Sequence, residues 1–122
     1  MGPPFIAYFG ATQQGNNRTT LLQTAYDQCR LYRQHLQEST TKLWQHVLLS
    51  SWQDTHLWAT GNAWAAAGML RVLQTLRISA VSESFVEQQK DLTNWVEEIL
   101  KASWDRQVHA LLFNHPASHF SC

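Results

Sequence analysis

The sequence has few charged residues and no excess of either sign. Only 15% of its 122 residues are charged, and nine Lys and Arg side chains balance nine Asp and Glu side chains. Proteins that bind nucleic acid or acidic membrane surfaces carry a basic patch. The composition therefore indicates neither partner. Zero net charge also gives little electrostatic protection against self-association.

Cysteine and long apolar runs are equally scarce. Cys29 and Cys122 form neither a disulfide framework nor a metal motif, so we interpret them as unrelated thiols. No apolar run is long enough to span a bilayer. The N-terminus lacks a basic segment, and Pro3 and Pro4 stand where an apolar segment would begin, so we expect no signal peptide. The compartment stays open.

Motifs for catalytic or metal chemistry are also missing. The chain holds no glycine-rich phosphate loop and no nucleophile elbow. Its carboxylates, such as Asp54, show no spacing typical of an acid–base pair. His115 and His119 have the spacing of metal ligands, but Pro116 prevents a helical pair. From these residues we predict no metal and no cofactor, and we assign no catalytic residue.

The most informative stretch is apolar and aromatic and runs from Trp58 to Leu73. Trp58 and Trp64 bracket a Gly-Asn pair, and mostly apolar residues follow. Asn62 is a good N-cap residue, which predicts a helix from Asn62 to about Ile78. Because nearly every position up to Leu73 is apolar, we expect protein to surround this helix.

An amphipathic helix is predicted on each side of this stretch. The first runs from about Thr20 to Glu38 and the second begins near Ser84, each with a capping-box spacing at its start. Their apolar stripes are Leu22, Ala25, Cys29, Tyr32 and Leu36, and then Leu92, Trp95, Val96, Ile99 and Trp104. Alternating buried and one-sided helices are typical of helical hairpins.

The remaining segments are predicted as follows. Residues Phe5 to Phe9 are apolar enough to be buried, and Gly10 to Asn17 has the composition of a turn. Leu43 to Leu49 is typical of an extended or irregular segment. Ser50 to His56 is polar and is predicted to be a loop. The sequence therefore predicts an all-α protein.

Six tryptophans are many for a chain of this length. Indole faces stack on the C–H faces of sugar rings, and the ring N–H can donate to a hydroxyl. Four of them surround the entry to the central helix, and two lie on the last helix: Trp44, Trp52, Trp58 and Trp64, then Trp95 and Trp104. We assign the last two to core packing. For Trp44 and Trp52, core packing and ligand contact both stay open.

The central stretch also carries a resemblance to a known family. It contains Trp58-Ala-Thr60-Gly61-Asn62-Ala-Trp64, which resembles the Trp-x-Arg-Gly-Asn-x-Trp segment of the unsaturated glucuronyl and rhamnogalacturonyl hydrolases, glycoside hydrolase families 88 and 105. The version here is similar to the fungal branch of family 105. The resemblance extends to residues 1–10, to residues 43–46 and, loosely, to residues 95–100.

The resemblance implies helical hairpins that form part of an (α/α)6 barrel, the six-hairpin glycosidase fold. Residues 1–122 are then expected to be a partial domain, truncated at both ends. The implied activity is hydrolysis of unsaturated uronyl or rhamnogalacturonyl oligosaccharides from pectin-like polymers, without a cofactor. In the family, the catalytic aspartate lies a few residues before the segment that Met1 to Phe5 matches, so weak or absent activity is expected.

The resemblance further implies a substrate-binding set, which comprises Trp58, Thr60, Asn62, Trp64, His46 and Trp44. His46 matches a histidine that lines the family's active site, although a lone histidine in an apolar run is also typical of a structural residue. Thr60 stands where the family has an arginine that binds the substrate carboxylate. A threonine cannot make that bidentate contact, so a neutral sugar becomes a candidate ligand. His56 is expected near the pocket mouth.

Two other functions are compatible with these residues. A non-catalytic carbohydrate-binding piece would use Trp58, Trp64 and His46 without turnover. A small helical interaction module would instead pair its apolar helix faces with another chain, and uncovered faces of this kind would promote self-association.

Overall fold

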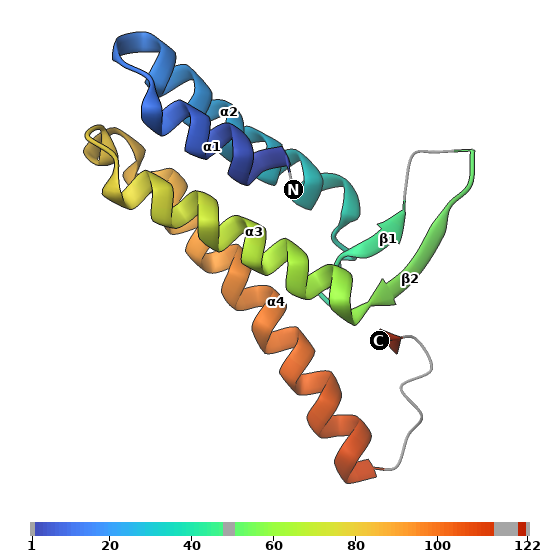
Figure 1. The fold of residues 1–122 in the computed structure, drawn as a ribbon. Helices are drawn as coiled ribbons and strands as arrows, with labels where there is room; N and C mark the ends of the chain where they lie inside the picture. The colour runs from blue at the N-terminus through green and yellow to red at the C-terminus, as the bar shows by residue number, and fades with distance from the viewer. Residues whose placement is uncertain (1, 48–50, 114–119, 122) are drawn as a thin grey trace.

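The computed structural model describes residues 2–47, 51–113 and 120–121. The helices are α1 (Gly2–Thr12), α2 (Gly15–Leu36), α3 (Ala59–Ile78) and α4 (Val86–Phe113), with a short 3-10 helix η1 (Ser82–Phe85) before α4. Figure 1 shows α1 beside α2, and it shows α3 followed by α4, which turns back along α3. The all-α prediction with helical hairpins is confirmed. Predictions that involve Cys122, His115 or His119 concern residues outside the described ranges.

Helix α1 joins the two hairpins, because it packs against both α2 and α3. A glycine permits its close approach to α2: a Cβ atom at Gly10 would lie 2.8 Å from the Cβ atom of Leu21. Against α3, a Cβ atom at Gly68 would lie 3.9 Å from Cγ of Pro4. The small residues of α3 therefore admit a neighbouring helix, as the composition of that stretch indicates.

The turn between α1 and α2 is shorter than predicted. Residues Gly10 to Asn17 were expected to form it, but helix occupies all of them except Gln13 and Gln14. The capping box at Thr20 is also wrong, because Thr20 lies inside α2. Its carbonyl accepts a hydrogen bond from the Thr24 hydroxyl one turn later. A capping-box spacing also occurs inside helices, so it does not locate a helix start by itself.

The core lies between α2, α3 and α4. Its buried members include Leu22 and Cys29 from α2, Met69, Val72 and Leu76 from α3, and Phe85, Leu92 and Ile99 from η1 and α4. Both predicted stripes supply core residues, which confirms the amphipathic pattern. Each stripe also contains an error. Tyr32 and Trp104 are exposed, so the prediction that Trp104 packs in the core is wrong.

A group of polar and aromatic contacts connects α2 to α4. The Tyr26 ring stacks on Trp95 with 5.6 Å between ring centroids, and the Tyr26 hydroxyl donates to Asp91 at 2.6 Å. Seven residues further along each helix, about two turns, Arg33 pairs with Glu98 at 2.8 Å. Trp95 is therefore packed against the core, as predicted.

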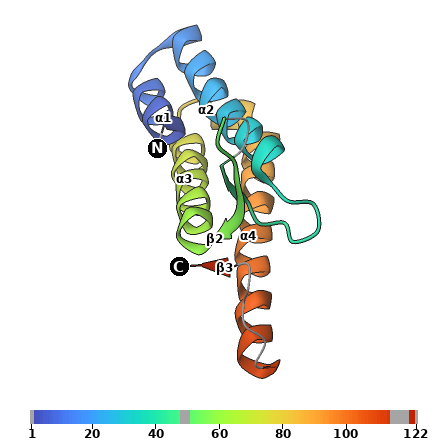
Figure 2. The ribbon, with the colours of Figure 1, turned by 90° about the vertical axis from the view of Figure 1, so that its right-hand side faces the viewer.

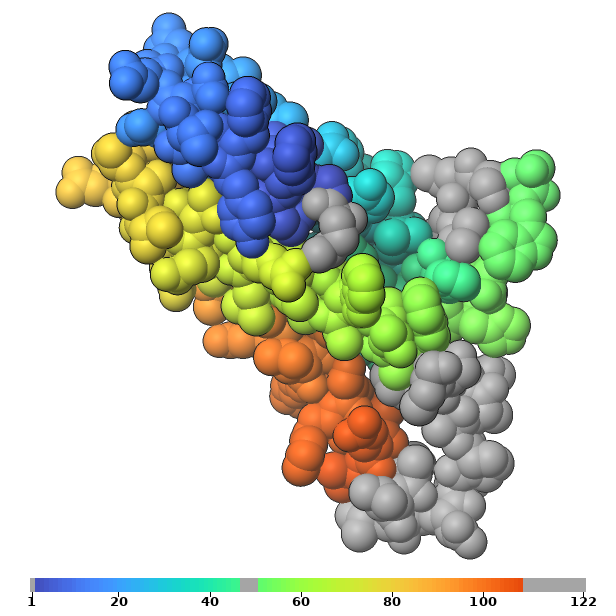
Figure 3. Space-filling view, viewed as in Figure 1, coloured from blue at the N-terminus to red at the C-terminus, as the bar shows by residue number. Residues whose placement is uncertain are grey.

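Helix α3 is not surrounded by protein, contrary to the prediction. Trp64, Leu70 and Ile78 are exposed along it, and the neighbouring α1 exposes Phe5 and Phe9, which were also expected to be buried. These two helices form much of the face seen in Figure 3. The physical reason is that the described elements packed against α3 leave these side chains uncovered. None of the described helices is long and apolar enough to cross a membrane.

A small sheet follows α2 and packs at the start of α3. Its strands are β1 (Gln45–Val47), β2 (Asp54–Trp58) and β3 (Phe120–Ser121), with β1 antiparallel and β3 parallel to β2. The extended prediction for residues 43–49 is confirmed at β1. The loop prediction for residues 50–56 is wrong from Asp54 onward, because pairing with β1 makes that segment a strand. Figure 2 shows β2 in front of the helices and α4 extending beyond them.

Candidate functional site

The candidate site lies where α1 and α3 both begin and where the β1–β2 hairpin meets α3 (Figure 1). Helix α3 starts at Ala59, with Trp58 in the N-cap position and no side-chain cap. The prediction that Asn62 is the N-cap is therefore wrong. Asn62 lies in the first turn of the helix and is only 1% exposed. Its side chain has a different use.

Asn62 connects the helix to the hairpin through three hydrogen bonds. Its Oδ1 accepts from the backbone N–H of Trp44 at 2.7 Å, and its Nδ2 donates to the Trp44 carbonyl at 2.9 Å. The same Nδ2 donates to the Trp58 carbonyl at 3.0 Å. A buried amide that is satisfied in this way holds the residues before β1 and at the end of β2 at set positions. Asn62 thus fixes the backbone of Trp44 and Trp58, on which the site is built.

The Trp58 indole lies against the first turn of α3 and is 37% exposed. Gly61 makes this arrangement possible, because a Cβ atom there would lie 2.8 Å from Cε3 of the indole. Any larger residue would push the ring away from the helix. The Gly-Asn pair therefore has two separate functions: Gly61 leaves space for the ring, and Asn62 secures the backbone beneath it.

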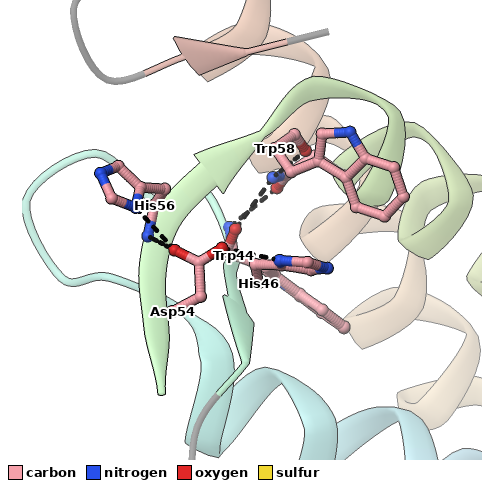
Figure 4. Close-up of polar contacts among 6 residues, drawn as sticks. Trp44, His46, Asp54, His56 and Trp58 are labelled. Carbon is pink, nitrogen blue, oxygen red and sulfur yellow. Dashed lines mark hydrogen bonds and ion pairs between the residues drawn. The ribbon is translucent and has the colours of Figure 1, made fainter. Parts of the chain in front are cut away.

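His46 contacts Trp58 from the neighbouring strand. Their ring centroids are 4.9 Å apart with an interplanar angle of 60°, and the centroid of the Trp52 ring lies 6.4 Å from that of His46. The Nδ1 atom of His46 lies 2.8 Å from Oδ2 of Asp54, and the His46 side chain is 37% exposed. Figure 4 shows His46 and Trp58 on the same side of the hairpin. The structure thus brings together two of the predicted site residues.

Asp54 stands between two imidazoles, which the sequence reasoning missed. Its Oδ1 accepts from the His56 backbone N–H at 3.0 Å and lies 2.6 Å from His56 Nδ1, while Oδ2 faces His46 (Figure 4). The hydrogen bond from the His46 side chain, followed by those from His56, holds the pKa of the Asp54 carboxyl well below its usual range. Asp54 is therefore an ionised hydrogen-bond acceptor near neutral pH and carries no proton to donate.

A signal for this cluster is present in the sequence. Asp54 and His56 are two positions apart, and residues at that spacing in a strand share a face. The prediction of a loop over residues 50–56 gives no reason to expect that Asp54 and His56 share a face. His56 contacts Asp54 and does not line the apolar pocket described next, so its expected place near the pocket mouth stays a prediction.

A second part of the site is an apolar pocket of about 220 Å³ between α1, α2 and α3. Trp44 and Trp64 line it together with Pro4, Gly61 and Gly68. Trp64 is 61% exposed and is available to a ligand. Trp44 is buried, so its main role is packing, although its indole Nε1 has no hydrogen-bond partner among the described residues. Gly61 borders both this pocket and the Trp58 ring.

Thr60 occupies the first turn of α3 and is exposed. Two positions after Trp58 in the sequence, the chain thus has a hydroxyl and no positive charge. Within the described part of the chain, no group of three or more His, Cys, Asp or Glu side chains is arranged to hold a metal ion.

Comparison with known families identifies the family to which this chain belongs. The model of Glycosyl Hydrolase Family 88 matches residues 1–114. The chain belongs to glycosyl hydrolase family 88. Membership confirms the resemblance seen in the Trp58–Trp64 segment and identifies the chain as a glycoside hydrolase by family, with oligosaccharides as the class of substrate. No curated protein and no solved structure gave a match.

Proposed function

We propose that this family 88 chain forms an oligosaccharide subsite in which a sugar ring stacks on Trp58 beside His46. The observation that carries the proposal is the half-exposed Trp58 indole, which Gly61 and His46 hold on two sides. A preorganised aromatic face with an adjacent polar ring suits the C–H face and hydroxyls of a sugar. The pocket beside Trp64 accommodates the next part of the ligand.

The proposed ligands are unsaturated uronyl or rhamnogalacturonyl oligosaccharides derived from pectin-like polymers. Thr60 makes the subsite insensitive to the charge of the sugar, because a hydroxyl cannot form the paired contacts of a guanidinium with a carboxylate. We therefore expect a neutral sugar of the same shape to bind about as well as a uronate.

We propose binding with weak or absent turnover. Hydrolysis by general acid–base catalysis needs a group that holds a proton near the working pH. Asp54 is the carboxylate hydrogen-bonded to His46, and its lowered pKa leaves it ionised. It therefore does not meet this requirement, and the described site residues support binding better than catalysis.

The test is replacement of Trp58 by alanine. Isothermal titration with a pectin-derived unsaturated disaccharide should show saturable binding to the wild-type protein. Trp58→Ala should weaken this binding at least about tenfold, which corresponds to about 1.4 kcal/mol. The lost stacking surface is the cause, because the backbone of Trp58 stays bonded to Asn62.

Trp104→Ala is the matched control. Trp104 is also an exposed tryptophan, but it lies on α4 and contributes to neither the hairpin nor the pocket. Its replacement should leave the affinity unchanged. If Trp58→Ala binds the disaccharide as tightly as the wild type does, the subsite assignment is wrong.

A second function, helix-mediated association, is favoured by one specific observation. Phe5 is 70% exposed and Phe9 and Trp64 are exposed on the same two helices, α1 and α3. Several large apolar side chains on one face are typical of an interaction surface. We propose that this face pairs with another chain, which can be a second copy.

Sedimentation velocity over a hundredfold dilution series is expected to show reversible self-association. The double variant Phe5→Ser/Phe9→Ser should shift the population toward monomer, because it removes exposed apolar area without touching the buried core. A wild-type protein that is monomeric at every concentration and unfolds in one sharp transition would contradict this second function.

A further inference from the structure

The hydrogen-bonded group of His46, Asp54 and His56 has a consequence for how a ligand is bound. We infer that Asp54 is a positioning residue that holds the His46 imidazole in its Nδ1–H form, so that Nε2 presents a lone pair beside the Trp58 ring. The inference deepens the proposed sugar subsite and, in its ligand part, rests on it. It assigns a role to a residue outside the predicted substrate-binding set.

The argument begins with what an ionised carboxylate can do. A carboxylate only accepts hydrogen bonds, whereas a neutral imidazole has one donor nitrogen and one acceptor nitrogen. The 2.8 Å separation of His46 Nδ1 and Asp54 Oδ2 is a full hydrogen bond. Nδ1 must therefore carry the hydrogen, and in the neutral ring Nε2 is the acceptor. The carboxylate selects the tautomer and also sets the plane of the ring.

The second step concerns what keeps Asp54 itself in place. Its other oxygen, Oδ1, accepts from the backbone N–H of His56 at 3.0 Å, and the His56 side chain lies 2.6 Å from the same oxygen. Asp54 and His56 both belong to β2, and the paired strand β1 carries His46. Carboxylate and imidazole are therefore fixed on adjacent strands and are arranged before a ligand arrives.

The third step is where the acceptor points. Figure 4 shows the second nitrogen of His46 directed away from Asp54, on the side of the hairpin where the Trp58 ring lies. A sugar ring stacked on Trp58 would bring a hydroxyl within reach of that nitrogen. Nε2 would accept the hydroxyl hydrogen, and a preorganised acceptor loses little freedom on binding. Within the described part of the chain, the recorded contacts of the His46 ring are with Asp54, Trp52 and Trp58.

The experiment measures the tautomer directly. Two-bond ¹⁵N–¹H spectra of ¹⁵N-histidine-labelled full-length chain distinguish Nδ1–H from Nε2–H imidazoles. Wild-type His46 should appear as Nδ1–H, whereas exposed His35 serves as the internal reference for an unconstrained imidazole. In Asp54→Ala, the His46 signals should move to the pattern of His35. In Asp54→Asn, whose amide oxygen can still accept, part of the Nδ1–H population should remain.

Sugar titration provides the second readout. Asp54→Ala should weaken binding of the unsaturated disaccharide by about tenfold, on the scale of one hydrogen bond, and Asp54→Asn should recover part of that loss. Asp105→Ala is the matched control, because Asp105 is an exposed aspartate in a surface pair with Lys101. It should change neither His46 signals nor affinity. Circular dichroism and melting confirm that each variant is folded.

The outcomes separate this inference from the proposed function. An Nε2–H tautomer for wild-type His46, or an unchanged tautomer in folded Asp54→Ala, would overturn the positioning role whatever the sugar does. If wild-type protein shows the Nδ1–H tautomer but binds no sugar, the proposed subsite is wrong, whereas the positioning of His46 by Asp54 is still supported. Equal sugar affinity in wild type and Asp54→Ala would overturn the ligand contact of Nε2.

Discussion

Replacement of Asn62 by alanine is expected to lower the free energy of unfolding by about 3 kcal/mol, the sum of three hydrogen bonds of about 1 kcal/mol each. The three bonds join the first turn of α3 to Trp44 and Trp58. The N–H and C=O of Trp44 would lose their partner in a buried setting, which adds to the loss. Urea unfolding followed by circular dichroism measures the effect.

The same variant should also weaken the sugar titration, because the Trp58 backbone would no longer be tied to the helix. Asn94→Ala is the matched control: Asn94 is an exposed asparagine in the interior of α4, and its loss should change stability by less than about 0.5 kcal/mol. If Asn62→Ala and Asn94→Ala unfold at similar urea concentrations, the role of Asn62 in joining helix and hairpin is wrong.

Replacement of Phe85 by alanine is expected to destabilise the protein by about 4 kcal/mol, in the range found for buried phenylalanines. Phe85 is the largest of the fully buried side chains at 1% exposure. It ends η1, which packs against both α3 and α4, and so it closes the second hairpin. Its removal leaves a cavity in the core and loses apolar burial. Thermal and urea unfolding should both show the loss.

Phe5→Ala serves as the control for this second expectation. Phe5 has the same side chain but is 70% exposed, so its removal should change the free energy of unfolding by less than about 0.5 kcal/mol. Comparable losses in the two variants would show that Phe85 is not a core residue in solution. Work at low protein concentration keeps self-association through α1 from entering the comparison.

Helix existence and the buried stripes were predictable from sequence, whereas helix boundaries were not. Leu22 and Cys29 are seven residues apart on α2 and are both buried, and Leu92 is a buried member of the stripe on α4. This signal is local, because residues three and four apart share a face of one helix. The start of α3 was misplaced at Asn62 because a good capping residue is also a good buried hydrogen-bonding residue. Only the Trp44 backbone, distant in sequence, shows which use applies.

The reach of local sequence patterns also explains which residues of the candidate site could be predicted. Trp58, Trp64 and His46 could be proposed from residue type and from the family resemblance. The strand that holds Asp54 could not, because a strand exists only where another strand pairs with it. The alternation of Asp54 and His56 is too short a pattern to distinguish a strand from a polar loop.

By itself, the sequence determined the all-α class, the two amphipathic faces, the family and the aromatic entry to α3. Each of these rests on residue type or on spacing within one element. Tertiary structure alone decided that Asn62 joins helix to hairpin, that α3 exposes Trp64, and that Asp54 orients His46 beside Trp58. These contacts link positions that the local pattern does not relate, and their geometry arises only when the hairpin packs against the start of α3.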